Sequence, residues 1–275
     1  MVSRLVIIVM IFLGGAVAAP TRPAAQDFTS LGVVRLATGP DYPPFSAEEL
    51  PDGGVITQLV RAAFERAGVT VTLETLPWRR GYEMTASGAI DATFPYAETA
   101  TRLEQMLFST PIFNVDVSLY YRRTAPILFR QPLDLAPFTL CAPIGYGLSP
   151  SIAELAQLDV LTVRETPSPL SCLRQAALGR VDAVVLPRLQ VRFLMDRFPN
   201  DLQGLTEAPR PFERRWNYLI GRKHAPRTQL VIEAFNHGYH ILRKSGARDE
   251  ILVRHLGVGA LNWVRLTDQM IYPDE

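Results

Sequence analysis

The chain has 275 residues, with 28 basic and 27 acidic side chains and a formal net charge of +1 at pH 7. That length is enough for one large domain or two small ones. The near-neutral charge gives no electrostatic reason to expect nucleic acid or an anionic membrane surface as a partner. The strongly basic nucleic-acid-binding proteins are therefore excluded.

Residues 1–19 have the pattern of a secretion signal. Arg4 precedes an apolar run at 5–13, and small residues at 16–19 provide a cleavage site. The apolar run is too short to span a bilayer, although an uncleaved N-terminal anchor remains the alternative. We expect residues 20–30 to be a flexible lead-in and the mature protein to be periplasmic.

The two cysteines, Cys141 and Cys172, would then enter an oxidising compartment. One intramolecular pairing is possible, and we predict a disulfide that stabilises the fold by about 3 to 4 kcal/mol. Two buried thiols are the alternative. The chain contains no C-x-x-C motif, which argues against redox catalysis.

The first part of the chain predicts an α/β arrangement of strand, helix, strand, helix and strand. Residues 33–37 and 69–76 have strand character, and residues 57–67 have apolar positions at helical spacing. Ligands of such sheets bind beyond the carboxyl ends of the strands. This rule gathers around one crevice Asp41, Tyr42, Phe45, Trp78, Arg79, Tyr96 and Arg102.

An internal repeat links the two halves of the chain. The segments SGAIDATFP at 87–95 and LGRVDAVVLP at 178–187 share the order helix end, glycine, apolar residue, Asp-Ala and apolar strand. Asp91 and Asp182 lead into runs that are apolar on both faces, as expected for parallel strands covered by helices. We expect two copies of one arrangement, one in each lobe, with a chance likeness as the alternative.

The second copy contains a glycine-rich turn at 145–150 that leads into a helix. Ser151 and Glu154 fit an S-x-x-E capping box. A helix N-terminus of this kind can hold an anion, so Tyr146, Gly147 and Ser149 join the candidate site. The alternative is a turn that only caps its helix.

The chain is expected to cross between the lobes twice. Residues 115–122 look like a strand that leaves the first lobe, and Pro209 to Pro211 mark a second extended crossing. We assign 31–121 plus 213–275 to lobe 1 and 122–212 to lobe 2. Two crossings between two lobes constitute a hinge.

The segment 95–113 carries the most specific motif of the chain. Thr99-x-x-Arg102 is followed at fixed spacing by Phe108-Ser109-x-Pro111. This resembles the T-x-x-R(x)5-F-S-x-P signature of family 3 bacterial solute-binding proteins, and the similarity extends from about residue 31 to 257. It implies a two-lobed, type II periplasmic-binding-protein-like α/β fold, a small-molecule ligand and an ABC permease as partner.

In that family the arginine forks onto the ligand carboxylate, a role that the resemblance gives to Arg102. An ordinary surface arginine is the alternative. Tyr42 and Trp78 would supply aromatic walls. Pro187 occupies the position of an aspartate that commonly holds the ligand amino group. We therefore expect a small polar solute that is anionic or amino-acid-like.

Two other functional classes remain open. The first is a sensory ligand-binding protein. The second is a dehydratase in which Glu98 acts as an acid; the alternative for Glu98 is a solvated glutamate in a loop. His237 and His240 lie three residues apart, but a metal site needs further ligands. We expect no catalytic residues, no cofactor, no metal and a monomer.

Overall fold

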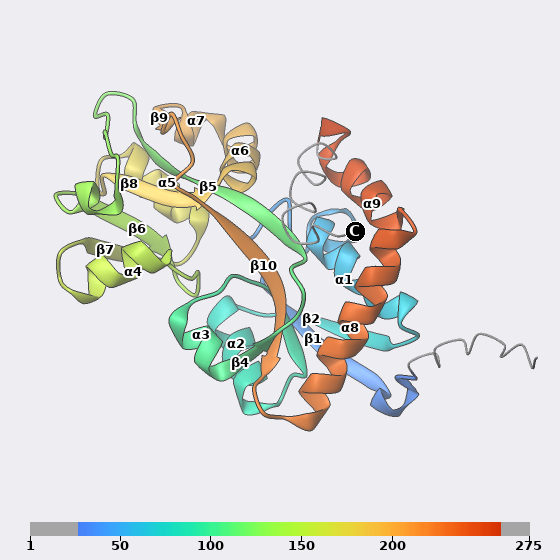
Figure 1. Cartoon of the computed structure of the whole chain (residues 1–275). Coiled ribbons are helices and arrows are strands. Elements are labelled where there is room, and N and C mark those ends of the chain that lie inside the picture. The colour runs from blue at the N-terminus through green and yellow to red at the C-terminus, as the bar shows by residue number, and fades with distance from the viewer. Residues whose placement is uncertain (1–26, 260–275) are drawn as a thin grey trace, which may run out of the picture.

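A computed structural model describes residues 27–259, which form two lobes joined by long strands (Figure 1). One continuous sheet has the order β2-β1-β3-β10-β5-β8-β6-β7, with β4 added to β10 and β9 added to β5. The strands are β1 Val33–Thr38, β2 Thr70–Thr75, β3 Ala92–Tyr96, β4 Met106–Phe108, β5 Phe113–Arg122, β6 Thr139–Pro143, β7 Thr162–Thr166, β8 Ala183–Pro187, β9 Leu205–Glu207 and β10 Glu213–Arg222.

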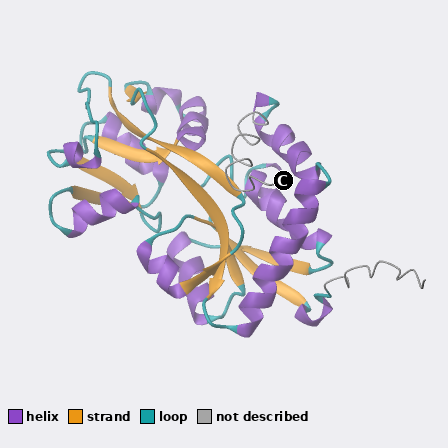
Figure 2. Cartoon of the chain, in the orientation of Figure 1, coloured by secondary structure: helices purple, strands orange, loops and turns teal. Residues whose placement is uncertain are grey.

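Helices cover the strands of both lobes, and the strands run as a continuous band through the molecule (Figure 2). This arrangement confirms the predicted two-lobed α/β class. The helices are α1 Val55–Arg66, α2 Trp78–Ser87, α3 Ala100–Gln105, α4 Pro150–Gln157, α5 Pro169–Ala177, α6 Arg188–Arg197, α7 Pro199–Leu202, α8 Pro226–Lys244 and α9 Ala247–Leu256. No helix between residues 27 and 259 combines the length and apolar character needed to cross a membrane.

The hinge consists of β5 and β10, which run antiparallel to each other between the lobes. β10 pairs with β5 over Glu213 to Asn217 and then with β3 and β4 of the first lobe. β5 continues into the second lobe, where it pairs with β8 and β9. Residues 209–211 run beside β5 and lead directly into β10, which forms the second crossing. The residue limits assigned to the lobes stay a prediction.

The internal repeat has a structural reason. The Asp91 carboxylate accepts the backbone N–H of Arg35 in β1 at 2.8 Å. In the second lobe, the Asp182 carboxylate accepts the backbone N–H of Thr139 in β6, also at 2.8 Å. Each aspartate thus fixes the first strand of its lobe beside the strand that the aspartate precedes, which explains why the Asp-Ala pair recurs.

One prediction about the N-terminal part of the chain needs correction. The signal at 1–19 and residues 20–26 of the lead-in lie outside the described residues. Phe28, however, is only 6% exposed, and its ring lies 5.8 Å from that of His237. Because Phe28 packs into the core, residues 27–30 are part of the first lobe and not a flexible lead-in.

The predicted capping box at Ser151 and Glu154 is also wrong. Helix α4 begins at Pro150, with Ser149 in the N-cap position and no side-chain cap bond. Proline is favoured at the first helical position because its missing N–H has no partner there in any case. Ser151 is therefore already inside the helix.

The core of the first lobe depends on a close contact between α1 and α8. Gly238 in α8 is buried, and a Cβ atom built there would lie 1.8 Å from the carbonyl oxygen of Ala63 in α1. Only glycine lets the two helix backbones approach this closely.

We predict that Gly238→Ala lowers the free energy of unfolding by about 1 to 3 kcal/mol, because overpacking outweighs the better helix propensity of alanine. Urea denaturation measures this, with Gly204→Ala as the matched control, since a Cβ at Gly204 meets nothing within 4 Å. Equal stability of the two variants would contradict the close helix contact.

The predicted disulfide is confirmed. Cys141 in β6 and Cys172 in α5 are bonded across a separation of 31 residues, with Cα atoms 5.5 Å apart. Both residues are buried in the core of the second lobe.

Replacement of both cysteines by alanine should lower the free energy of unfolding by about 3 to 4 kcal/mol, since closing a loop of this length constrains the unfolded chain. Denaturation with and without reductant tests this. Reductant should lower the free energy of unfolding of the natural protein and leave that of the double variant unchanged. A loss below about 1 kcal/mol would contradict the prediction.

Candidate ligand-binding site between the lobes

A small cavity of about 60 Å³ lies between the lobes, where the ends of β1 and β3 face the turn after β6. Six of the predicted site residues line it together with residues of the hinge. The lining consists of Tyr42, Trp78, Pro95, Tyr96, Ala97, Arg102, Val115, Gly145, Tyr146, Gly147, Arg215 and Asn217. The sequence prediction therefore located the cavity, but it missed Arg215 and Asn217.

Arg102 reaches across the cavity from the first lobe. It lies in α3, where the Thr99 side chain caps the helix by accepting the Arg102 N–H at 3.3 Å. Its guanidinium lies 4.7 Å from the centre of the Tyr96 ring. Nη1 donates to the Ala97 carbonyl at 2.9 Å, and Nη2 donates to the Gly145 carbonyl of the second lobe at 3.2 Å. Burial lowers the pKa of Arg102 to about 10, so the group stays charged at neutral pH.

Arg215 approaches the same turn from the hinge strand β10. Its Nη1 donates to the Gly147 carbonyl at 2.6 Å, and its Nη2 donates to the Leu148 carbonyl at 3.4 Å. The side chain is 15% exposed, and its Nε lies 3.4 Å from a carboxylate oxygen of Glu213. Burial lowers the pKa of Arg215 as well.

The adjacent arginines of β10 point in opposite directions. Arg214 is bound to Asp116 of β5 at 2.9 Å, whereas Arg215 faces the cavity. Successive side chains of a strand alternate between its two faces. The alternation in Glu-Arg-Arg-Trp-Asn could have identified one inward arginine, once the segment was recognised as a strand with both faces covered.

A second interlobe contact involves Asp41, Tyr146 and Gln190. The Tyr146 hydroxyl donates to the backbone carbonyl of Asp41 at 3.0 Å. Gln190 Nε2 donates to the same carbonyl at 3.0 Å and to the Tyr146 oxygen at 2.9 Å. The sequence analysis did not identify Gln190. Helix α6 begins at Arg188, which places Gln190 in its first turn with 0% exposure.

Aromatic rings form the wall of the cavity, as predicted for Tyr42 and Trp78. The Trp78 ring meets those of Tyr42, Tyr96 and Tyr146 edge-on, with centroids 5.7 to 6.1 Å apart. Its Nε1 donates to the Asp41 carboxylate at 2.6 Å. Burial raises the pKa of the Asp41 carboxyl, and the bond from the indole opposes that effect.

Four polar atoms beside the cavity have no hydrogen-bond partner within the described chain. One is Glu213 Oε1, which has only its ion pair with Arg215, and the other three are Asn217 Nδ2, Ser149 Oγ and Gln190 Oε1, on residues that are at most 3% exposed. A second cavity of about 50 Å³ adjoins the first and shares Tyr146, Gly147 and Arg215 with it. Ser149 lines this second cavity. Buried polar groups are normally satisfied, so these atoms indicate where a polar ligand would bind.

The other predicted site residues lie outside the first cavity. Phe45 is fully buried behind Tyr42, with ring centroids 4.8 Å apart. The Asp41 side chain faces Trp78. Arg79 is exposed, and its backbone nitrogen lies 3.2 Å from where a Cβ of Gly145 would lie. The prediction that Arg79 lines the crevice was wrong because α2 turns that side chain outward.

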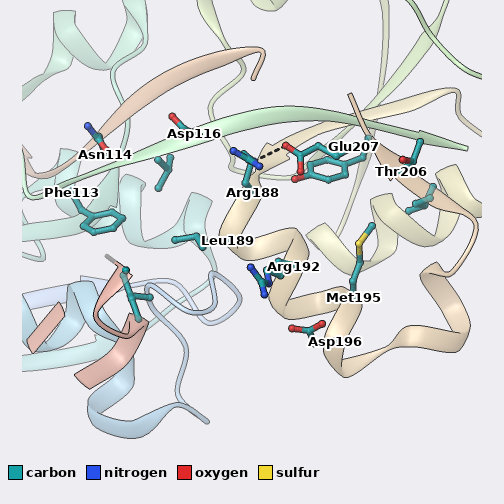
Figure 3. Close-up of a pocket in the computed structure, with 15 residues that line it drawn as sticks. Phe113, Asn114, Asp116, Arg188, Leu189, Arg192, Met195, Asp196, Thr206 and Glu207 are labelled. Carbon is teal, nitrogen blue, oxygen red and sulfur yellow. Dashed lines mark ion pairs between the residues drawn. The ribbon is translucent and has the colours of Figure 1, made fainter. Parts of the chain in front are cut away.

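A larger cavity of about 680 Å³ lies elsewhere along the hinge strand (Figure 3). Its walls include Asn114 and Asp116, which alternate with Val115 along β5, and the helix α6. Its Arg188 is paired with Glu207 at 2.6 Å, and its Asp116 is paired with Arg214. We prefer the smaller cavity as the ligand site because buried cationic donors from two elements converge there. Within residues 27–259 no three His, Cys, Asp or Glu side chains are grouped as a metal site would require.

Comparison with solved structures shows the same fold. A histidine kinase sensor domain with similarity to periplasmic binding proteins has a TM-score of 0.71 and 24% identity, covering 82% of this chain and 96% of its own. An ancestral arginine-binding protein bound to arginine has a TM-score of 0.70 and 21% identity, with coverages of 82% and 99%. An amino acid ABC transporter substrate-binding protein from Streptococcus pneumoniae bound to L-arginine has a TM-score of 0.65 and 22% identity, with coverages of 83% and 96%.

No curated protein matches the sequence. The sequence model of the family described as bacterial extracellular solute-binding proteins, family 3, matches residues 34–258, which is most of the chain. The two lobes, the hinge strands and the interlobe cavity agree with that match. The chain therefore belongs to family 3 of the bacterial extracellular solute-binding proteins.

Proposed function

We propose that this protein captures a small polar solute, anionic or amino-acid-like, between its lobes and delivers it to an ABC importer in the inner membrane. The observation that carries the proposal is the position of Arg102, a residue of the first lobe whose guanidinium donates to the Gly145 carbonyl of the second lobe. A group that bridges the lobes in this way can couple ligand binding to closure.

A ligand carboxylate would replace the carbonyl partners of Arg102. Hydrogen bonds between a guanidinium and a carboxylate are charge-assisted, and they are roughly twice as strong as bonds between neutral groups. The planar guanidinium also offers paired donors that match the two carboxylate oxygens. An anionic solute therefore competes favourably with the Ala97 and Gly145 carbonyls for this side chain.

Entry of the solute requires the lobes to separate. The Tyr146 and Gln190 side chains hold the Asp41 carbonyl across the cleft, and these bonds must break on opening. Rotation about β5 and β10 would move the turn at 145–148 away from Arg102. Closure around the solute then re-forms the bonds of Tyr146 and Gln190 to the Asp41 carbonyl. The closed form presents the surface that a permease would recognise.

Location and assembly belong to the same proposal. The segment at 1–19 would direct export, and family members are extracellular solute-binding proteins. We propose a periplasmic monomer. The family and its structural neighbours bind ligands, and Glu98 is exposed, as a solvated loop residue would be. A dehydratase role therefore has little support.

A sensory role is the second candidate. The histidine kinase sensor domain is as similar in fold as the transport proteins are. In that case the closed form would be read by a membrane kinase. Permease and ATPase genes next to this gene would favour import, and a kinase gene would favour sensing.

We predict that Arg102→Gln abolishes solute binding, since glutamine retains polarity but loses the charge and the paired donors. A thermal-shift screen of the chain from residue 20 onward would use amino acids, organic acids, polyamines and small peptides. A solute at about 100 times its Kd should stabilise the protein by about 2.7 kcal/mol. For a chain of this size, where 1 kcal/mol corresponds to roughly 2 to 4 °C, that is a rise of roughly 5 to 11 °C in Tm.

The matched control is Arg79→Gln, because Arg79 is exposed and does not line the cavity. The control should keep the full shift, whereas a folded Arg102→Gln variant should show less than about a quarter of it. An unchanged shift in Arg102→Gln would move the site away from this cleft. Absence of any shift across the screen would count against solute binding altogether.

A further inference from the structure

We propose that the solute is a short dianion without an ammonium group, bound at one end by Arg102 and at the other by Arg215. This inference rests on the proposed function and specifies its ligand class. It assigns a ligand-binding role to Arg215 and Asn217 on the hinge strand β10, which the sequence motif did not indicate.

Both guanidinium groups donate to carbonyls of the same turn. Arg102 Nη2 donates to the carbonyl of Gly145, and Arg215 Nη1 donates to the carbonyl of Gly147. A Cβ atom at Gly147 would lie only 2.8 Å from Arg102 Nη1. The turn thus presents oxygen acceptors to both cations, as a ligand with two anionic groups would.

The spacing of these two carbonyl acceptors limits the length of the ligand. Gly145 and Gly147 are two residues apart, and two residues of chain span at most about 7 Å. Two carboxyl groups joined by two or three carbon atoms fit within that span. Dicarboxylates of four and five carbons are therefore short enough to replace both carbonyl acceptors.

Charge favours a dianion over a zwitterion. Two buried guanidinium groups repel each other, and Arg215 contributes to the lowered pKa of Arg102. Glu213 pairs with Arg215 from outside the cavities, and no Asp or Glu side chain lines either of the two small cavities, so a ligand ammonium group would meet two guanidinium groups there and no carboxylate. Burying a charge is favourable only when a partner compensates it.

The nearest carboxylates already have partners. Asp41 accepts the Trp78 indole N–H at 2.6 Å, and Glu213 lies 3.4 Å from Arg215. The second cavity, which extends beneath the turn, is lined on this side by Pro187 and Ser149. Asn217 Nδ2 and the Ser149 hydroxyl, for which residues 27–259 supply no hydrogen-bond partner, are donors that suit anionic oxygens.

Calorimetric titration of the natural protein at low salt, with matched solutes, tests the inference. Succinate is compared with L-aspartate and glutarate with L-glutamate, because each pair differs only in the ammonium group. Butyrate serves as a monoanion and L-arginine as a cationic amino acid. We expect each dicarboxylate to bind at least 10-fold more tightly than its amino-acid partner and than butyrate.

Arg215→Gln should lower the affinity for the dicarboxylates at least 10-fold and change the affinity for butyrate by no more than about 2-fold. Arg214→Gln is the matched control, because Arg214 is bound to Asp116 on the other face of β10, and it should change neither affinity. If Arg215→Gln does not fold, Arg215→Lys keeps the charge but loses the fork, and a smaller loss specific to the dicarboxylates is expected.

The outcomes separate the two proposals. Tighter binding of aspartate, glutamate or arginine than of the dicarboxylates would overturn the ligand class and leave the solute-binding function intact. A dicarboxylate affinity that Arg215→Gln does not change would overturn the role of Arg215. Absence of binding by every solute of the thermal-shift screen and of this panel would reject the proposed function together with the inference.

Discussion

The structure depends on the contact between two buried arginines and one glycine-rich turn. Arg102 comes from the first lobe and Arg215 from the hinge, and both donate to backbone carbonyls of the turn at 145–148. Glycine is required there because a Cβ at Gly145 would lie 2.7 Å from the Trp78 side chain. The same contact thus closes the lobes, excludes larger residues from the turn and places two positive charges where a solute would bind.

The sheet explains how this contact can be made and broken. Each lobe has parallel outer strands fixed by an aspartate, Asp91 or Asp182, whereas β5 and β10 in the centre run antiparallel and belong to both lobes. Because two strands are the main covalent and hydrogen-bonded link, the rotation of the lobes that we propose would leave both cores undisturbed. The disulfide between Cys141 and Cys172 lies within the second lobe and leaves the hinge free.

Local patterns predicted the fold well. The repeated Asp-Ala strands, the helix periodicity and the motif around Arg102 can each be identified within a short stretch of consecutive residues. The site was predicted only in part. Arg215 and Gln190 were missed since their roles arise from long-range packing, which brings β10 and α6 against the turn at 145–148. Arg79 was misplaced for a related reason: one residue of helical rotation separates it from the inward-facing Trp78.

A crystal structure with the solute that stabilises the protein most is the most direct test of this account. We expect anionic oxygens of the solute within hydrogen-bonding distance of both Arg102 and Arg215, with the carbonyls of Gly145 and Gly147 displaced from those guanidinium groups. A solute in the larger cavity beside Arg188, with the contacts of Arg102 and Arg215 to the turn unchanged, would contradict it.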